Sequence, residues 1–215
     1  MFDFHQEAFR ASGLSNKTQI KDWMEKLDYM AGQFLSSCDL ESQPMEKARL
    51  LFQWLWKDRP DRYRRHGNFR LHHVIRAQAD RQACSVGNCL GLTLLYNCLL
   101  LRIGISPKAI YLENAFDRGP HLLTHLKIDK LSLDVDNIFT HGFNYKGHLN
   151  DPARIIWGDR EIVGEIYHSA GNELFEKGSF RAALQNYTTA LEMNPRHEKV
   201  RLNMKILMER IKEDN

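Results

Sequence analysis

The sequence feature that most constrains the fold is the segment at residues 85–104, SVGNCLGLTLLYNCLLLRIG, which is apolar on nearly every face of a helix. Asn88 is a preferred N-cap residue and Gly104 is a preferred C-terminal stop, so a helix is predicted between them. A helix that is apolar all round is buried rather than laid on a surface. We therefore expect this segment to be the central helix of the core.

Cys89 occupies the first turn of this predicted helix. A cysteine at that position lies at the positive end of the helix macrodipole, which favours the thiolate, and the free backbone amides there can bind an oxyanion. Cys89 is therefore the candidate nucleophile. The alternative is a buried apolar role, as expected for Cys38 and Cys98, because free cysteine often behaves as a small hydrophobic residue.

Composition is that of a globular protein, with 215 residues and 43% hydrophobic content, enough for one domain plus an appendage. No apolar run reaches membrane-spanning length and the N-terminus has no secretory pattern, so we expect a cytoplasmic protein with no membrane partner. The cysteines include no C-x-x-C pair, which predicts neither a zinc site nor a disulfide framework. Reduced thiols fit a cytoplasmic location.

Positive charge gathers in residues 57–81, although the formal net charge of the chain is only +3. Such a local excess can meet an acidic partner or a phosphate backbone. No nucleic-acid-binding motif accompanies it, so we expect a solvated loop whose arginines pair within the fold, and not a nucleic-acid partner. Pro60 and Gly67 predict an irregular connection inside this stretch.

Helical periodicity marks residues 18–36 and 45–57, and residues 69–78 fit a shorter helix, whereas residues 1–16 show little pattern. Residues 108–113 have the composition of a strand. Two β-like runs, residues 121–128 and 131–137, enclose a two-residue turn at Asp129-Lys130, which predicts a β-hairpin.

The predicted hairpin pairs Lys127 with Ser132 and His125 with Asp134. Because side chains alternate along a strand, one face then carries a mostly polar set, namely His121, Leu123, His125, Ser132, Asp134 and Asp136. Thr124 is the polar exception on the opposite, apolar face. The polar face either contacts water at a sheet edge or holds a histidine against a carboxylate for Cys-His-Asp chemistry.

The order of these motifs resembles the transglutaminase-like superfamily. The similarity lies in GNCLGLTLLY at the helix start, GPH before a strand and VDN near the end of the next strand. The resemblance implies an α+β fold: N-terminal helices and a papain-like core in which a central helix packs on a small antiparallel sheet. It also implies a triad of Cys89, His121 and Asp136.

The sequence leaves open a second pair, His125 with Asp134, because these residues oppose each other directly. His121 with Asp136 is the preferred pair, because the start of a strand is expected to lie nearer the helix terminus than the turn does. Asn137 and Leu122 depart from the family pattern, which has a proline and an aromatic residue at these positions.

Residues 164–197 match one tetratricopeptide repeat (TPR) at Tyr167, Ala170, Gly171, Leu174, Gly178, Phe180, Ala183, Tyr187, Ala190 and Pro195. Residues 198–212 should add a capping helix with Val200, Met204 and Leu207 turned inward. The chain thus resembles a bacterial branch that joins a transglutaminase-like core, residues 1–160, to a repeat with its cap, residues 161–215. A single repeat needs a neighbour, so it either binds a peptide or completes the fold.

Two functions follow from this interpretation. The first is a thiol enzyme that acts on an amide by hydrolysis, deamidation or transamidation without a metal or organic cofactor. The backbone amide at Cys89 would form the oxyanion hole, with Gln78 or Gln82 as a second donor. The second is a module without turnover that holds a protein or peptide partner, in keeping with members of the branch that have no established activity.

Overall fold

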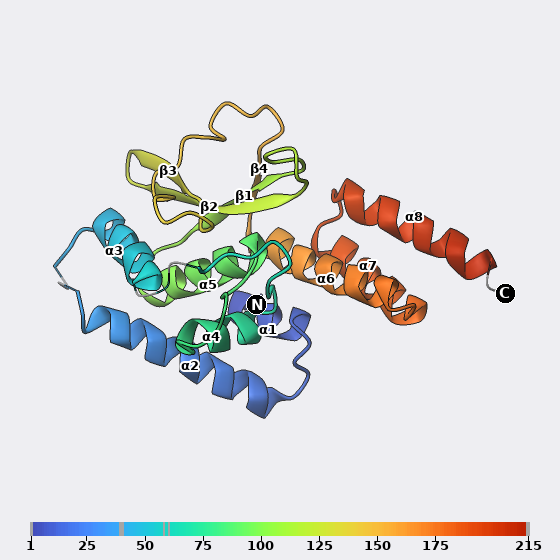
Figure 1. Cartoon of the computed structure of the whole chain (residues 1–215), viewed down its shortest axis with the longest axis horizontal. Coiled ribbons are helices and arrows are strands. Elements are labelled where there is room, and N and C mark those ends of the chain that lie inside the picture. The colour runs from blue at the N-terminus through green and yellow to red at the C-terminus, as the bar shows by residue number, and fades with distance from the viewer. Residues whose placement is uncertain (1, 39–40, 58, 60, 214–215) are drawn as a thin grey trace. The chain divides into compact units, whose positions relative to one another are not determined.

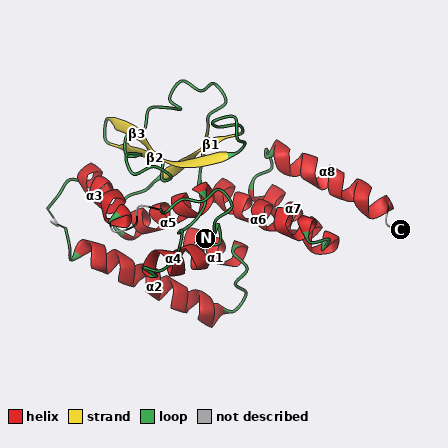
Figure 2. Cartoon of the chain, in the orientation of Figure 1, coloured by secondary structure: helices red, strands yellow, loops and turns green. Residues whose placement is uncertain are grey.

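The structure is a computed structural model that describes residues 2–38, 41–57, 59 and 61–213, so Pro60 lies outside the described residues. The chain divides into two compact units. Ser15–Gly158 forms the core unit, and Met1–Leu14 with Asp159–Asn215 forms the helical unit. The fold is α+β, as expected, with helices in both units and one antiparallel sheet in the core unit (Figure 2).

The core unit is organised around α5 (Cys89–Arg102). This helix packs on the sheet through β2 and contacts the other helices of the unit, α2 (Lys17–Leu35), α3 (Pro44–Trp56) and α4 (Leu71–Ala79), as Figure 1 shows. Every residue from Leu90 to Leu100 is buried. The prediction of a central core helix is therefore confirmed.

The sheet is antiparallel, with the strand order β3-β2-β1-β4. Its strands are β1 (Lys108–Leu112), β2 (His121–Ile128), β3 (Leu131–Val135) and β4 (Ile155–Trp157). The predicted hairpin register is confirmed, because His125 opposes Asp134 and Lys127 opposes Ser132. β4 was not expected from the sequence. The connection between β3 and β4 arches over the face of the sheet that is turned away from α5 (Figure 1).

A buried polar network fixes α5 against the sheet. Thr124 of β2 donates to Asn97 Oδ1 over 2.6 Å, and Thr93 donates to the Leu122 carbonyl over 3.1 Å. Asn137, which replaces the family's proline, donates through Nδ2 to Thr124 Oγ1 over 3.0 Å. Thr124, the polar residue on the apolar face of the hairpin, thus links the helix to the sheet by hydrogen bonds.

The substitution Thr124→Val is expected to lower the free energy of unfolding of the core unit by about 1–3 kcal/mol. Valine keeps the shape of threonine but removes a hydroxyl that serves two buried amides, and an unsatisfied buried polar group costs about that much. Urea unfolding followed by tryptophan fluorescence would measure it. The exposed Thr140 offers the control Thr140→Val, and equal effects of the two substitutions would contradict the prediction.

The helical unit contains α1 (Phe4–Ala11), α6 (Asp159–Glu176), α7 (Phe180–Met193) and α8 (Glu198–Glu213). α1 packs on α6, although the sequence showed little pattern there and its first residues were assigned to the core. Asp3 caps α1 by accepting a hydrogen bond from the Gln6 amide, and Phe4 and Phe9 are buried. The expected division at residue 160 therefore has to be corrected for residues 1–14.

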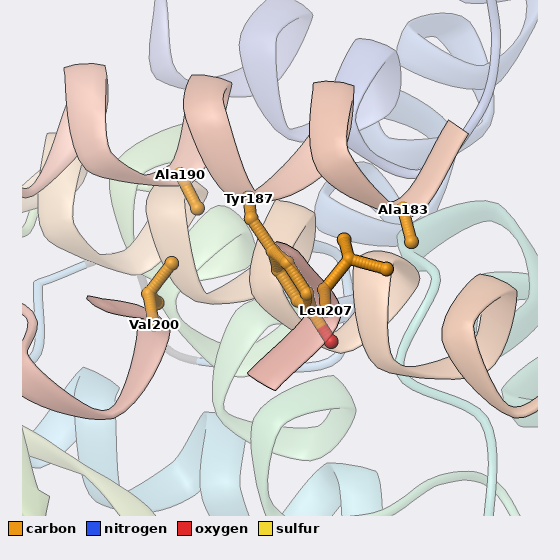
Figure 3. Close-up of a cluster of buried hydrophobic side chains, with 5 residues drawn as sticks. All are labelled: Ala183, Tyr187, Ala190, Val200 and Leu207. Carbon is orange, nitrogen blue, oxygen red and sulfur yellow. The ribbon is translucent and has the colours of Figure 1, made fainter. Parts of the chain in front are cut away.

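α6 and α7 pack closely because Gly171 has no side chain. A Cβ atom at Gly171 would lie 2.6 Å from the Tyr187 ring. Tyr187 belongs to a buried cluster drawn in Figure 3, with Ala183, Ala190, Val200 and Leu207. Val200 and Leu207 come from α8, and Met204 packs on the cluster while partly buried, so the expected inward face of the third helix is confirmed. No helix of the described residues has the length and hydropathy of a membrane span.

Candidate active site

The start of α5 is held by two segments that precede it. The Val86 amide donates to the Arg62 carbonyl over 2.9 Å, and the Asn88 amide donates to the Asn68 carbonyl over 3.0 Å. Asn88 caps the helix by accepting from the Gly91 amide over 3.0 Å. A Cβ atom at Gly91 would lie 2.3 Å from the Asn68 oxygen. Close backbone packing therefore fixes the position of Cys89.

Cys89 is a free, half-buried thiol at the first position of α5. Within the described part of the chain, the amides of Cys89 and Leu90 have no hydrogen-bond acceptor, as is usual for the first turn of a helix. These amides are the donors that an oxyanion beside the sulfur requires.

His121 and Asp136 form a buried pair, the second part of the candidate site. His121 is the first residue of β2, and its Nε2–H donates to Asp136 Oδ2 over 2.9 Å. The side chains are 5% and 0% exposed. Asp136 Oδ1 accepts from the Ile138 amide over 3.3 Å, and the Asp136 amide donates to the Gly142 carbonyl over 2.9 Å. Both groups of the pair are thus held in place.

The ionisation of His121 depends on Asp136 and Cys89. Burial lowers the pKa of His121, but hydrogen bonds to Asp136 and then to the Cys89 side chain, with the negative charges of both, outweigh burial and raise this pKa to about 10. The imidazole is therefore bound to the carboxylate, and it lies close enough to Cys89 for that residue to raise its pKa. The structure brings together the three residues that the family resemblance singles out.

The alternative pair, His125 and Asp134, has a different set of contacts. His125 Nδ1–H donates to Asp134 Oδ1 over 2.8 Å, and Arg154 binds both Asp134 oxygens, over 2.8 and 3.2 Å. Burial raises the pKa of Asp134, but the hydrogen bonds from His125 and Arg154 outweigh burial and lower it. Arg154 also donates to the His148 carbonyl over 3.0 Å. This pair anchors the connection between β3 and β4.

The two carboxylates on the polar face of the hairpin are buried, whereas Ser132, next to the turn, is exposed. Asp134 and Asp136 are 1% and 0% exposed, and both are paired with histidines. The hypothesis that this face contacts water at a sheet edge is therefore wrong for these two carboxylates.

Sequence reasoning missed several residues that line the site. His148 is buried with its ring centroid 5.9 Å from that of His121, and burial, followed by the charge of His121, lowers the pKa of His148. Phe116 contacts both rings edge-on, at 5.5 and 4.7 Å. Tyr63 forms a bridge with Gly87, and burial, then the negative charge of Cys89, raises the pKa of Tyr63. None of these residues lies in a motif with periodic spacing.

The expectation for Gln78 is corrected by the structure. Its Oε1 accepts from Arg62 Nε over 3.1 Å, and its Nε2 donates to the Leu55 carbonyl over 3.0 Å. Gln78 is thus engaged elsewhere and is not a second oxyanion donor, while Gln82 is exposed. Arg59 and Arg62 are buried, and Arg59 donates to the Ala77 carbonyl. These two arginines do have partners within the fold, as expected, but the expectation of a solvated loop is wrong for them because both are buried.

The chain was compared with models of known protein families, with curated proteins and with solved structures, and no match was found in any of the three. The transglutaminase-like and TPR resemblances therefore remain expectations from sequence motifs. The function has to be argued from the side chains of the site and their geometry.

Proposed function

We propose that the core unit is a transglutaminase-like thiol enzyme that acts on an amide by hydrolysis, deamidation or transamidation. The observation that carries this proposal is the buried hydrogen bond between His121 and Asp136, together with the position of Cys89 at the start of a buried helix, close enough to His121 to raise the pKa of its imidazole. A nucleophile, a base and a residue that orients the base are the minimum set for such chemistry.

In the proposed reaction, the Cys89 thiolate attacks the amide carbon and the carbonyl oxygen takes up the negative charge. The free amides of Cys89 and Leu90 stabilise that oxygen. His121 then gives its proton to the departing amine as the C–N bond breaks, which leaves a thioester on Cys89. His121 next accepts a proton from water or a primary amine, whose attack on the thioester releases the product and restores the thiolate beside a protonated His121.

Asp136 supports the reaction through the orientation of His121. Its carboxylate binds Nε2–H of the imidazole, so the other ring nitrogen is left for the exchange with sulfur. The same carboxylate stabilises the protonated ring that forms when His121 acts as a base. Because a thiolate nucleophile has to stay reduced and Cys89 forms no disulfide within the described part of the chain, we also propose a cytoplasmic location.

The first test is the reactivity of Cys89 toward iodoacetamide at pH 6, measured by mass spectrometry of the labelled peptides. Cys89 is expected to react about tenfold faster than the exposed Cys84, because a neighbouring imidazolium and the start of a helix both favour the reactive form of a cysteine. His121→Ala should slow the reaction of Cys89 about tenfold and leave Cys84 unchanged. His125→Ala is the matched control and should leave both rates unchanged.

If Cys89 reacts no faster than Cys84, or if His125→Ala slows it and His121→Ala does not, the proposed triad is wrong. Turnover is tested separately with a glutamine-containing protein and a biotinylated primary amine. Incorporation of the amine or release of ammonia should occur with the natural chain and be absent from Cys89→Ser. A reactive Cys89 without either product would favour the module without turnover.

A pocket in the helical unit supports a second candidate function, the binding of a protein or peptide. The pocket has a volume of about 300 Å³ and is lined by Asn172, Phe175, Glu176, Tyr187, Asn203 and Ile206. Side-chain amides beside aromatic and aliphatic groups suit the backbone and side chains of a peptide. We therefore propose that a TPR-like helical hairpin in this unit contacts a partner, whether or not the core unit turns over.

A further inference from the structure

His148 lacks the hydrogen bonding that its burial requires. The side chain is 7% exposed, and among the described residues its Nε2 atom has no hydrogen-bond partner. An unsatisfied buried nitrogen costs about 1–3 kcal/mol, and native structures carry few of them. The proposed thiol reaction makes no use of this imidazole. The unsatisfied Nε2 atom therefore indicates that His148 binds a ligand that the chain itself does not supply.

The neighbours of His148 have the chemistry of a metal site. One ligand atom from each of His121, Asp136 and His148 lies within 4.8 Å of the other two, and all three residues are buried. His121 Nε2 and Asp136 Oδ2 are already 2.9 Å apart. Bonds of about 2.0–2.2 Å to a tetrahedral ion place its ligand atoms about 3.4 Å from one another. A small movement of these side chains would complete that geometry.

The position of His148 is set by contacts outside the three ligands. Arg154 donates to the His148 carbonyl and binds Asp134 on β3, so the connection is tied to the sheet on which His121 lies. The rings of Phe116 and Tyr145 pack on His148, with centroids 4.7 and 5.5 Å away. Prearranged ligands of this kind favour ion binding, because little ordering remains to be done when the ion arrives.

A second group of residues in the helical unit, Glu165 with His168 and His197, meets the same distance criterion but differs in its hydrogen bonds. His168 Nε2 accepts from the side-chain amides of Asn172 and Asn203, so its proton is on Nδ1 and is donated to Glu165. An ion bound to His168 Nδ1 would force the proton onto Nε2. That nitrogen already accepts hydrogen bonds from two side-chain amides, so a proton there would be repelled. The hydrogen bonds of this second group are therefore complete without a metal ion, and we do not propose an ion site there.

From these contacts we infer that His121, Asp136 and His148 form a binding site for a divalent transition ion of the zinc class. Two imidazoles and a carboxylate are typical zinc ligands, and a fourth position is left for water. The ion would replace the proton between His121 and Asp136. His121 would then carry its one proton on the ring nitrogen nearer Cys89, and losing it would leave an imidazolate anion.

An ion at this site would therefore inhibit the thiol chemistry by blocking proton transfer through His121. This consequence rests on the proposed function, whereas ion binding does not. The two are separable in experiment, because Cys89 is not a member of the group of ligand residues His121, Asp136 and His148. Cys89→Ser abolishes thiol chemistry and should leave ion binding unchanged.

The test uses the full chain, freed of metal by a chelator and titrated with zinc against a chromophoric chelator. We expect one zinc per chain in this site and a loss of affinity of about a hundredfold in His148→Ala. His148→Gln, which keeps a polar side chain of similar length, should show the same loss if His148→Ala does not fold. The exposed His141 of the same connection provides the control His141→Ala, with unchanged affinity.

Circular dichroism in the presence of chelator would verify that each variant is folded. The inference is overturned if both His148 variants bind zinc as the natural chain does. It is also overturned if Cys89→Ser abolishes binding while the His148 variants keep it, since the ion would then be held by sulfur. Unreactive Cys89 together with zinc binding that depends on His148 would reject the proposed function and retain the ion site.

Discussion

Glu165→Gln is expected to lower the free energy of unfolding of the helical unit by about 3 kcal/mol at neutral pH. Glu165 is buried in α6, and its Oε2 accepts from His168 Nδ1 over 3.2 Å and from His197 Nε2 over 2.6 Å. Burial raises the pKa of Glu165, but the charge and hydrogen bonds of His168, then those of His197, lower it from 4.5 to about 2. A pKa shift of that size corresponds to a contribution of about 3 kcal/mol to the free energy of unfolding.

The pH dependence of this contribution has a definite sign. Because the pKa of Glu165 is lower in the folded state than in the unfolded state, the stabilisation is complete above pH 4.5 and is lost as the pH falls through about 2. The natural helical unit should thus lose stability between these values. Glu165→Gln, which has no proton to bind, should lack this part of the acid sensitivity.

The measurement is urea unfolding at pH 7 and pH 3, followed by the imidazole resonances of His168 and His197, which report on the helical unit alone. Glu192, an exposed glutamate on α7, supplies the control Glu192→Gln and should change stability by less than about 0.5 kcal/mol. Equal stability of Glu165→Gln and Glu192→Gln at pH 7 would show that the buried carboxylate contributes nothing.

Gly142→Ala is expected to destabilise the core unit by about 3 kcal/mol and to slow alkylation of Cys89. A Cβ atom at Gly142 would lie 1.8 Å from the Asp136 carbonyl oxygen, far inside contact distance. The backbone has to move to relieve this overlap, which breaks the hydrogen bond from the Asp136 amide to the Gly142 carbonyl. Overpacking of this kind costs about 1–3 kcal/mol or more, and it also displaces the carboxylate that orients His121.

Tryptophan fluorescence during urea unfolding would measure this effect, because the tryptophans at positions 23, 54, 56 and 157 all lie in the core unit. Gly32→Ala is the matched control: Gly32 lies inside α2, and a Cβ atom there would meet nothing within 4 Å. Since alanine is the better helix former, Gly32→Ala should stabilise the unit by about 1 kcal/mol. A loss below about 1 kcal/mol in Gly142→Ala would contradict the prediction.

The elements that could be predicted from the sequence are those specified by short-range chemistry. α5 is bounded by its own cap and stop, at Asn88 and Gly104, and is buried because it is apolar all round. The register of the β2–β3 hairpin follows from its two-residue turn. Once that register is known, the pairing of His125 with Asp134 follows from alternation alone.

The elements that were missed depend on partners distant in the sequence. β4 has three residues, two of them exposed, and exists because β1 offers it an edge. α1 has 8 residues, too few for a clear period, and its buried face needs α6. The position of His148 depends on Arg154 reaching Asp134 and on the packing of aromatic rings. No local pattern encodes contacts of this kind, so the ion site was absent from the sequence-based hypothesis, which expected no metal.

The discontinuous make-up of the helical unit has a consequence for synthesis. α1 is translated before any residue of the core unit, yet the helix it packs on, α6, begins at Asp159. While the ribosome completes the core unit, the apolar side of α1, with Phe4 and Phe9, has no native partner. Chains fold in the order in which they emerge. The nascent chain therefore exposes the apolar side of α1 until α6 has been synthesised and can cover it.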